Sequence, residues 1–236
     1  MNTGKAEVYL IDGKLYIDDV LQSDIRDEYI YHESLVHPAM SHTLSRERVL
    51  ILGGSEGCTA REVLKWNDVR SVTQVDWDEA LCDAFYTRFD WNDSAYWDRR
   101  FKLVIDDAWK FCERAEPASY DVIIIDLLDP ELSNLDKFKE LLGLCRGLLA
   151  AGGTLSANTG GIFPWETKVY CEILKIIPGG SAYKVFVPSF EWEWSFILLG
   201  EVGEGFFPTD LRNKTRMFDL GITWQQMKTW RRDYLV

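Results

Sequence analysis

The chain has 236 residues, of which 47% are hydrophobic and 14% aromatic, which argues against a disordered protein and fits either one large domain or one domain with a small appendage. Its 38 acidic side chains outnumber 26 basic ones, and the net charge of −12 disfavours nucleic acids and acidic membranes as partners. No apolar run approaches the roughly 20 residues of a membrane helix, and the polar start predicts no secretion signal, so we expect a cytoplasmic protein.

The opening residues predict a β-hairpin. Two short runs, EVYLI and LYIDD, flank the turn-forming pair Asp12-Gly13. We expect residues 1–26 to form this small β appendage and residues 27–236 to form the main domain. Residues 10–38 also collect carboxylates and tyrosines, which indicates either a solvated acidic face or a pocket that receives a cation.

From residue 49 onward, predicted strands and helices alternate. The expected strands are 49–54, 71–78, 101–108, 120–130 and 154–159, followed by a closing pair at 183–188 and 194–200. The expected helices are 59–66, 79–89, 135–153 and 166–177. This alternation predicts an α/β fold with a doubly wound, mostly parallel Rossmann-like sheet of the methyltransferase type. Ligands of such sheets bind beyond the carboxyl ends of the strands.

Four of these strands end in acidic residues or in a glycine-rich loop. The first runs into Gly53-Gly54-Ser55-Glu56-Gly57, whose glycines let a ligand approach the backbone before a helix begins. Asp76 follows about twenty residues later, the spacing of an acid that accepts both ribose hydroxyls. Asp107, after the third strand, is placed to accept from an adenine amino group. The pattern predicts a nucleoside site, with tight packing and a helix-capping acid as the alternative.

Glu56 indicates which nucleoside would fit. A pyrophosphate needs backbone amides and no negative charge here, so an adenosyl sulfonium fits better than a dinucleotide. Two unit charges about 4 Å apart interact by roughly 4 kcal/mol at an effective dielectric near 20. A carboxylate in the loop would repel the α-carboxylate of S-adenosylmethionine and attract the amine of its decarboxylated form. The sign of this interaction favours the decarboxylated ligand.

Five stretches in chain order carry a family resemblance: YIYHESLVHPAM, LGGSEGCTAREVLKW, IIIDLLDP, GIFPWETKV and VPSFEWEWSFI. They resemble the polyamine aminopropyltransferases, the spermidine and spermine synthases, and their spelling is most similar to the thermospermine-synthase branch. The resemblance implies that decarboxylated S-adenosylmethionine donates an aminopropyl group to a polyamine amine and leaves methylthioadenosine. It implies a co-substrate in place of a cofactor, no metal, and a role in polyamine biosynthesis.

On the donor side, the resemblance implies that Glu56 and Asp126 hold the aminopropyl amine. Asp76 would bind the ribose, Asp107 the adenine, and Gln22 would lie near the donor. The complete implied donor set is Gln22, Gly53, Gly54, Glu56, Gly57, Asp76, Asp107 and Asp126.

On the acceptor side, the resemblance implies that Tyr31 and His32 lie at the mouth of the site and that Asp129 is a second acceptor acid. Apart from the resemblance, Trp192 and Trp194 flank Glu193 and are interpreted either as core or pocket-wall residues or as the lining of a polyamine channel by cation–π contact.

The resemblance implies a catalytic role for the first acid of the DLLDP stretch. An alkyl amine with a pKa of about 10.4 must lose a proton before it attacks, which costs roughly 4 kcal/mol near neutral pH. One carboxylate must accept that proton while others bind the distal charges of the polyamine. The resemblance assigns the proton to Asp126 and the charge to Asp129.

Several neighbouring residues receive simpler interpretations. Asp18, Asp24 and Glu28 are interpreted as solvated, and Asp78 and Asp106 as capping or solvated residues.

Metal ions and disulfides are not expected. His37 and His42 have no matching third ligand. Five dispersed cysteines without a C-x-x-C pair predict free thiols in a reducing compartment.

Two other functions stay open. One is an S-adenosylmethionine-dependent methyltransferase on the same sheet. The other is a truncated, non-catalytic homologue that binds nucleoside or polyamine, since members of the resembled family carry a longer N-terminal β-domain. The expected partners are small molecules, polyamine and adenosyl sulfonium, with a homodimer as one candidate assembly.

Overall fold

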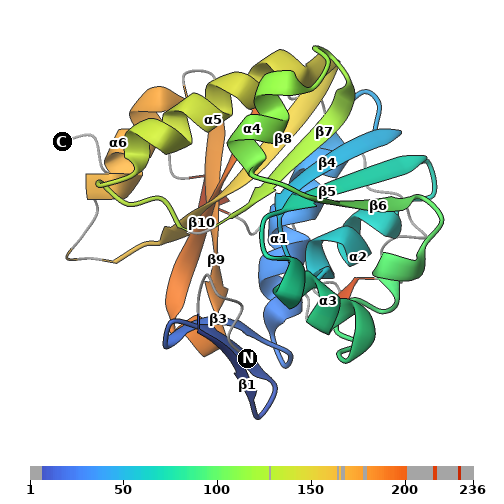
Figure 1. Ribbon diagram of the computed structural model, residues 1–236. Coiled ribbons are helices and arrows are strands. Elements are labelled where there is room, and N and C mark those ends of the chain that lie inside the picture. The colour runs from blue at the N-terminus through green and yellow to red at the C-terminus, as the bar shows by residue number, and fades with distance from the viewer. Residues whose placement is uncertain are drawn as a thin grey trace.

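The computed structural model describes residues 7–127, 129–163, 165, 168–177, 180–200, 215–216 and 228–229. They form an eight-stranded sheet with helices on both faces and a separate three-stranded antiparallel sheet close to its end (Figure 1). The α/β class and the mostly parallel sheet are thereby confirmed. None of the helices in these ranges combines the length and apolar character needed to cross a membrane.

The large sheet has the strand order β11-β9-β10-β8-β7-β4-β5-β6. Strands β8, β7, β4, β5 and β6 run parallel, whereas β10 pairs antiparallel with both β8 and β9. The bounds are β4 (Arg48–Gly53), β5 (Ser71–Asp76), β6 (Phe101–Ile105), β7 (Tyr120–Asp126), β8 (Leu149–Gly161), β9 (Ser181–Val187), β10 (Trp192–Gly200) and β11 (Lys228–Thr229).

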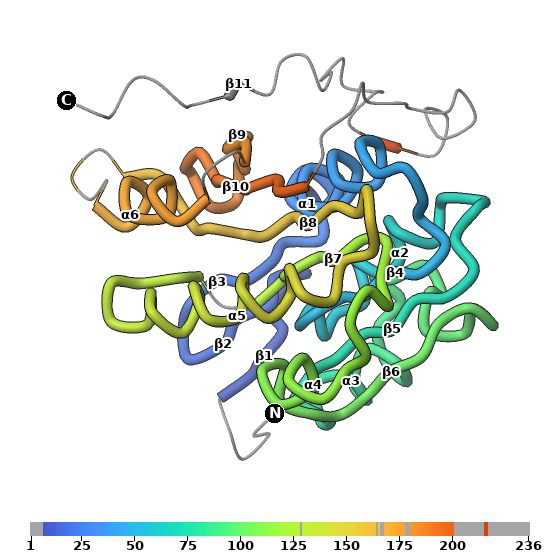
Figure 2. The backbone as a smooth tube through the Cα atoms, turned by 90° about the horizontal axis from the view of Figure 1, so that it is seen from above, coloured from blue at the N-terminus to red at the C-terminus, as the bar shows by residue number. Residues whose placement is uncertain are grey.

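Helices cover the two faces of this sheet in separate sets. The bounds are α1 (Glu28–His42), α2 (Cys58–Leu64), α3 (Glu79–Thr87), α4 (Ala108–Arg114), α5 (Leu135–Leu148) and α6 (Lys168–Ile176), with 3-10 turns η1 (Ala95–Trp97) and η2 (Pro188–Phe190). Helices α4, α5 and α6 lie on one side and α1 and α2 on the other (Figure 2). Side chains alternate along β4. Leu50 and Leu52 pack in the apolar core that includes residues of α4, α5 and α6, and Val49 and Ile51 pack in the core that includes residues of α1 and α2.

Several predicted boundaries differ from the structure. Helix α1 was not predicted, because its polar residues are spread around the helix and most of them are buried, so no amphipathic stripe marks it. Strand β6 is shorter than 101–108 because α4, also not predicted, begins at Ala108. Strand β8 begins at Leu149, inside the predicted helix 135–153, and ends at Gly161, two residues after the predicted strand 154–159. The predicted helix 166–177 is present from Lys168, and residues 166 and 167 lie outside the described residues.

The N-terminal hairpin is confirmed as β1 (Val8–Ile11) and β2 (Lys14–Ile17), and β3 (Val20–Asp24) adds a third strand. Asp12 and Gly13 have φ angles of 50° and 75°, the positive values that a two-residue hairpin turn requires. Val8 and Leu15 from this sheet pack with the α3 residues Leu81 and Phe85 in one apolar cluster. This contact fixes the small sheet over the end of the large one. The division of the chain at residue 26 stays a prediction.

Candidate active site

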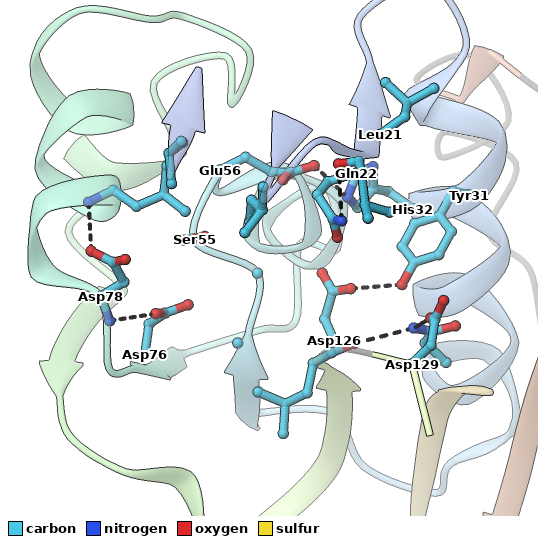
Figure 3. A pocket seen from close by; sticks show the side chains of 18 of the residues that line it. Leu21, Gln22, Tyr31, His32, Ser55, Glu56, Asp76, Asp78, Asp126 and Asp129 are labelled. Carbon is cyan, nitrogen blue, oxygen red and sulfur yellow. Dashed lines mark hydrogen bonds and ion pairs between the residues drawn. The ribbon is translucent and has the colours of Figure 1, made fainter. Parts of the chain in front are cut away.

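A cavity of about 360 Å³ lies where β4, β5 and β7 end, with the N-terminal sheet forming one of its walls (Figure 3). Most of the side chains predicted for a ligand site meet here. The predicted residues that line it are Gln22, Tyr31, His32, Gly53, Gly54, Glu56, Asp76, Asp126, Asp129 and Trp194.

The glycine loop allows β7 to end directly beside it. Gly53 and Gly54 have φ angles of +84° and +72°, and a Cβ on Gly53 would lie 2.1 Å from the carbonyl oxygen of Asp126. The backbone N–H of Gly54 instead donates to that oxygen at 3.0 Å. Gly57 has φ +77°, and a Cβ there would lie 2.8 Å from the Tyr96 ring. Gly57 therefore shapes the turn into α2 without lining the cavity.

Both carboxylate oxygens of Asp126 accept hydrogen bonds. The phenol of Tyr31 donates to Oδ1 at 2.8 Å, and the hydroxyl of Thr59 donates to Oδ2. Burial raises the pKa of Tyr31 well above its usual value, and the charges of Asp126 and Asp129 raise it further, so Tyr31 stays a donor. These two bonds fix the orientation of Asp126 at the centre of the cavity (Figure 3).

Asp129 and Asp76 lie on either side of Asp126. Burial raises the pKa of Asp129 to about 6 against the opposing hydrogen bond from Asn158, whose Nδ2 donates to Oδ1 at 2.7 Å. Burial also raises the pKa of Asp76 to about 6, and the charges of Asp78 and Asp126 add to the shift. Two carboxyl groups therefore titrate near neutral pH in the same cavity, a feature typical of functional sites.

Two acidic residues expected to be solvated are buried, so those interpretations were wrong. Glu28 is 3% exposed, because Arg61 and His32 bind its carboxylate. Asp24 is 1% exposed and pairs with Arg26 and Lys14. In both cases a nearby cation compensates the loss of hydration.

The interpretations of Asp18 and Asp78 agree with the structure. Asp18 is exposed at the edge of the cavity. Asp78 caps α3 by accepting from the backbone N–H of Leu81 at 3.1 Å.

Besides Gly57, two predicted site residues do not line the cavity. Asp107 is exposed and caps α4 by accepting from the backbone N–H of Lys110 at 3.0 Å. Trp192 contacts Trp165, with ring centroids 4.8 Å apart, whereas its neighbour Trp194 does line the cavity. The adenine role of Asp107 and the polyamine role of Trp192 stay predictions.

Sequence reasoning missed two polar side chains that orient the acids. Thr59 binds Asp126 from the first turn of α2, and Asn158 binds Asp129 from β8 while accepting from the indole N–H of Trp194 at 2.9 Å. Asn158 could have been found, because it stands near the carboxyl end of the predicted strand 154–159, where this fold collects ligand-binding groups. Thr59 carries no comparable signal.

Residues 28–199 match the model of the spermine/spermidine synthase domain. The chain belongs to this family. Among its relatives, the polyamine aminopropyltransferase of Aeropyrum pernix is 32% identical over 92% of this chain and 72% of its own length. Polyamine aminopropyltransferase 1 of Hyperthermus butylicus is 38% identical over 79% of this chain and 67% of its own length. The predicted family is thus confirmed, and the thermospermine branch within it stays a prediction.

Solved structures carry the same fold. The spermidine synthase of Thermotoga maritima superimposes with a TM-score of 0.70 at 27% identity, over 80% of this chain and 64% of that one. A spermidine synthase in complex with the transition-state analogue AdoDATO matches with the same TM-score at 28% identity. This chain spans about two thirds of the length of these relatives, between 64% and 72%.

Proposed function

We propose that the chain is a polyamine aminopropyltransferase, which moves an aminopropyl group from decarboxylated S-adenosylmethionine to a polyamine amine and releases methylthioadenosine. The observation that carries this proposal is the group of carboxylates Glu56, Asp76, Asp126 and Asp129 around one cavity. Both substrates are cations, and acidic walls favour cations. Membership of a family whose relatives are named polyamine aminopropyltransferases supports the same assignment.

The donor would lie across the ends of β4 and β5. Asp76, the last residue of β5, would accept from the ribose hydroxyls. Glu56 and Asp126 would hold the aminopropyl amine from two sides, since both line the cavity. The α-carboxylate of S-adenosylmethionine would add a negative charge beside these acids. The site should therefore prefer the decarboxylated donor, which argues against the methyltransferase alternative.

The acceptor would enter between Tyr31, Asp129 and Trp194. In the transfer, the lone pair of the polyamine nitrogen forms a bond to the carbon beside the sulfonium, and the carbon–sulfur bond breaks to leave the neutral thioether. The attacking nitrogen must lose one proton, and Asp126 would accept it. The hydrogen bonds from Tyr31 and Thr59 fix the orientation of the Asp126 carboxylate, so the base is positioned before the acceptor binds.

Mass spectrometry of the products tests this proposal directly. The protein is incubated with decarboxylated S-adenosylmethionine and putrescine, spermidine or norspermidine in turn. We expect methylthioadenosine and one aminopropylated polyamine, and a thermospermine product from spermidine would support the finer assignment. Methyl transfer from S-adenosylmethionine, or binding of both ligands without any product, would overturn the proposal in favour of one of the two alternatives.

A further inference from the structure

A row of buried charges joins α1 to the glycine loop beside the cavity. His32 is 3% exposed, and its ring lies between two carboxylates: Nδ1 is 2.8 Å from Oε2 of Glu28, and Nε2 is 3.3 Å from Oε1 of Glu56. Beyond Glu28, the guanidinium of Arg61 donates to both carboxylate oxygens at 3.0 and 2.8 Å. The order Glu56, His32, Glu28, Arg61 alternates acid and base, and Arg61 pairs in turn with Glu62, which Lys65 also binds.

The geometry calls for a proton on each ring nitrogen of His32. Nδ1 faces two acceptors, the carboxylate of Glu28 and its backbone carbonyl oxygen at 2.9 Å, while Nε2 faces Glu56. A neutral imidazole donates from one nitrogen only, so its other lone pair would point at a carboxylate. Burial by itself lowers the pKa of His32, but hydrogen bonds and charges of Glu28 and Glu56 outweigh burial and raise it to about 10.

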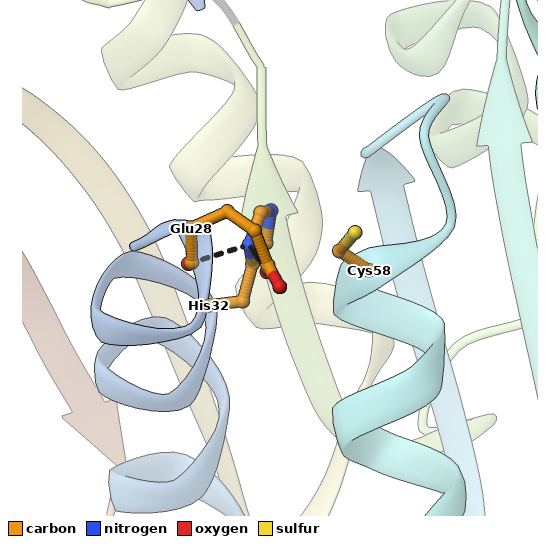
Figure 4. Close-up of side chains that lie close together, drawn as sticks. All are labelled: Glu28, His32 and Cys58. Carbon is orange, nitrogen blue, oxygen red and sulfur yellow. Dashed lines mark hydrogen bonds and ion pairs between the residues drawn. The ribbon is translucent and has the colours of Figure 1, made fainter. Parts of the chain in front are cut away.

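The same cluster has the composition of a metal site, because potential ligand atoms of Glu28, His32 and Cys58 lie within 4.8 Å of one another (Figure 4). The cation at this cluster is the guanidinium of Arg61. Arg61 binds Glu28 through two hydrogen bonds and donates to the Cys58 sulfur at 3.7 Å. Burial raises the pKa of the Cys58 thiol well above its usual value, and a doubly protonated imidazole offers no lone pair. The cluster is therefore a set of ion pairs.

We propose that His32 is a positioning residue, an imidazolium bridge that holds Glu56 in place for the amine of the donor. The inference rests on the function proposed above, and it gives His32 a different role from the acceptor contact that the family resemblance implied. Glu56 stands in the loop between β4 and α2, and the bridge ties this loop to α1, which also carries Tyr31. The charged and titratable groups around the ring are Glu28 and Tyr31 on α1, Glu56 on the loop, and Cys58 and Arg61 on α2.

The protonation state of the bridge can be measured without any ligand. In the full chain with ¹⁵N-labelled histidine, the ring nitrogens of His32 are assigned from the signals that disappear in His32→Gln. We expect both nitrogens to keep imidazolium chemical shifts from pH 6 to pH 9. A neutral ring at pH 7.5 would overturn the bridge, whatever reaction the protein catalyses.

The positioning role is tested by calorimetry with two ligands that differ in the amine. For His32→Gln we expect the affinity for decarboxylated S-adenosylmethionine to fall by about tenfold, the usual effect of losing one charged hydrogen bond. The affinity for methylthioadenosine, which lacks the amine, should change by less than about twofold. His42→Gln is the matched control, since His42 lies on the same helix and its ring contacts the Pro38 carbonyl oxygen.

Three results would count against the positioning role. Equal losses for both ligands would indicate general damage to the site. Stronger binding of the decarboxylated donor would show that the positive charge of His32 opposes the amine. Unchanged donor binding with a raised polyamine KM would assign His32 to the acceptor. If the unaltered protein binds neither ligand, the proposed function fails, and the histidine spectra still decide whether the bridge exists.

Discussion

Two groups of carboxylates lie at the cavity or directly beside it, and they differ in how their charge is compensated. On the helix side, Glu28 is neutralised by Arg61 and by His32, which also contacts Glu56. On the sheet side, Asp126 and Asp129 accept hydrogen bonds from uncharged donors, and no ion pair reaches them within the described ranges. The first group compensates its charge inside the protein. The second leaves negative charge facing the cavity, which is the arrangement a cationic substrate needs.

The pKa values reflect this difference. Arg61 and His32 lower the pKa of Glu28 although burial opposes them, so its carboxylate stays ionised. Burial instead raises the pKa of Asp76 and of Asp129 to about 6, and among the described residues no cation pairs with either to offset it. Ionised Glu28 therefore contributes to stability, whereas Asp76 and Asp129 oppose folding at neutral pH and favour the binding of a cation.

The largest expected effect is the loss of stability when Arg61, the cation beside Glu28, is replaced. Arg61→Met leaves both Glu28 and the fully buried Glu62 with one partner fewer, and breaking a buried pair in this way costs about 3–5 kcal/mol. We expect the free energy of unfolding, measured in urea, to fall by that amount. Arg70→Met is the control, because Arg70 is 76% exposed and its pair with Glu47 should contribute less than about 1 kcal/mol. Similar losses in both variants would mean that the buried row is not a special source of stability.

On the sheet side, the largest effect should be on turnover. Asp126→Asn keeps the size of the side chain and part of its hydrogen bonding but removes the proposed base. Single-turnover rates should fall by at least about 100-fold, the low end for general acid–base catalysis, with a smaller change in methylthioadenosine affinity. Asp68→Asn is the control, a half-exposed acid that pairs with Arg46. Turnover near the level of the unaltered protein would remove the catalytic role from Asp126.

The sequence predicted the sheet side of this comparison far better than the helix side. Asp76 and Asp126 end apolar runs, and the rule that ligands bind at strand ends predicts that they lie close together. Glu28 and His32 stand in a stretch without apolar periodicity, and Arg61, the cation that binds the buried Glu28, lies far away in the sequence. Pairing between distant charges leaves no local pattern, so the stretch could be interpreted as a solvated acidic face.

Removing the charge of Asp129 should stabilise the protein. The folded-state pKa of about 6 lies above the ordinary value of 3.8, so the folded state holds the proton more tightly than the unfolded state does. That advantage disappears as the pH rises from about 4 to 6. Asp129→Asn should therefore raise the free energy of unfolding by about 1–2 kcal/mol at pH 7.5, and by little at pH 4. Urea unfolding at both pH values checks this, and a destabilised variant at pH 7.5 would contradict it.

The smallest expected effect is the pH dependence of methylthioadenosine affinity, which reports on nucleoside binding without the aminopropyl amine. Methylthioadenosine lacks the aminopropyl amine, so the proposed ribose contact to Asp76 should be the main reason why its binding depends on pH between 5 and 7.5. Ribose hydroxyls donate to an ionised carboxylate, and a pKa of about 6 means that Asp76 loses most of its charge between pH 7.5 and 5. The affinity should then fall by about three- to tenfold over this range, with proton release on binding near pH 6. Calorimetry in two buffers of different ionisation enthalpy measures both quantities.

Asp76→Asn should bind more weakly and show no pH dependence, because the variant accepts hydrogen bonds without titrating. If the affinity of Asp76→Asn falls equally when the pH is lowered, or if the unaltered protein binds more tightly at low pH, the ribose lies elsewhere in the cavity.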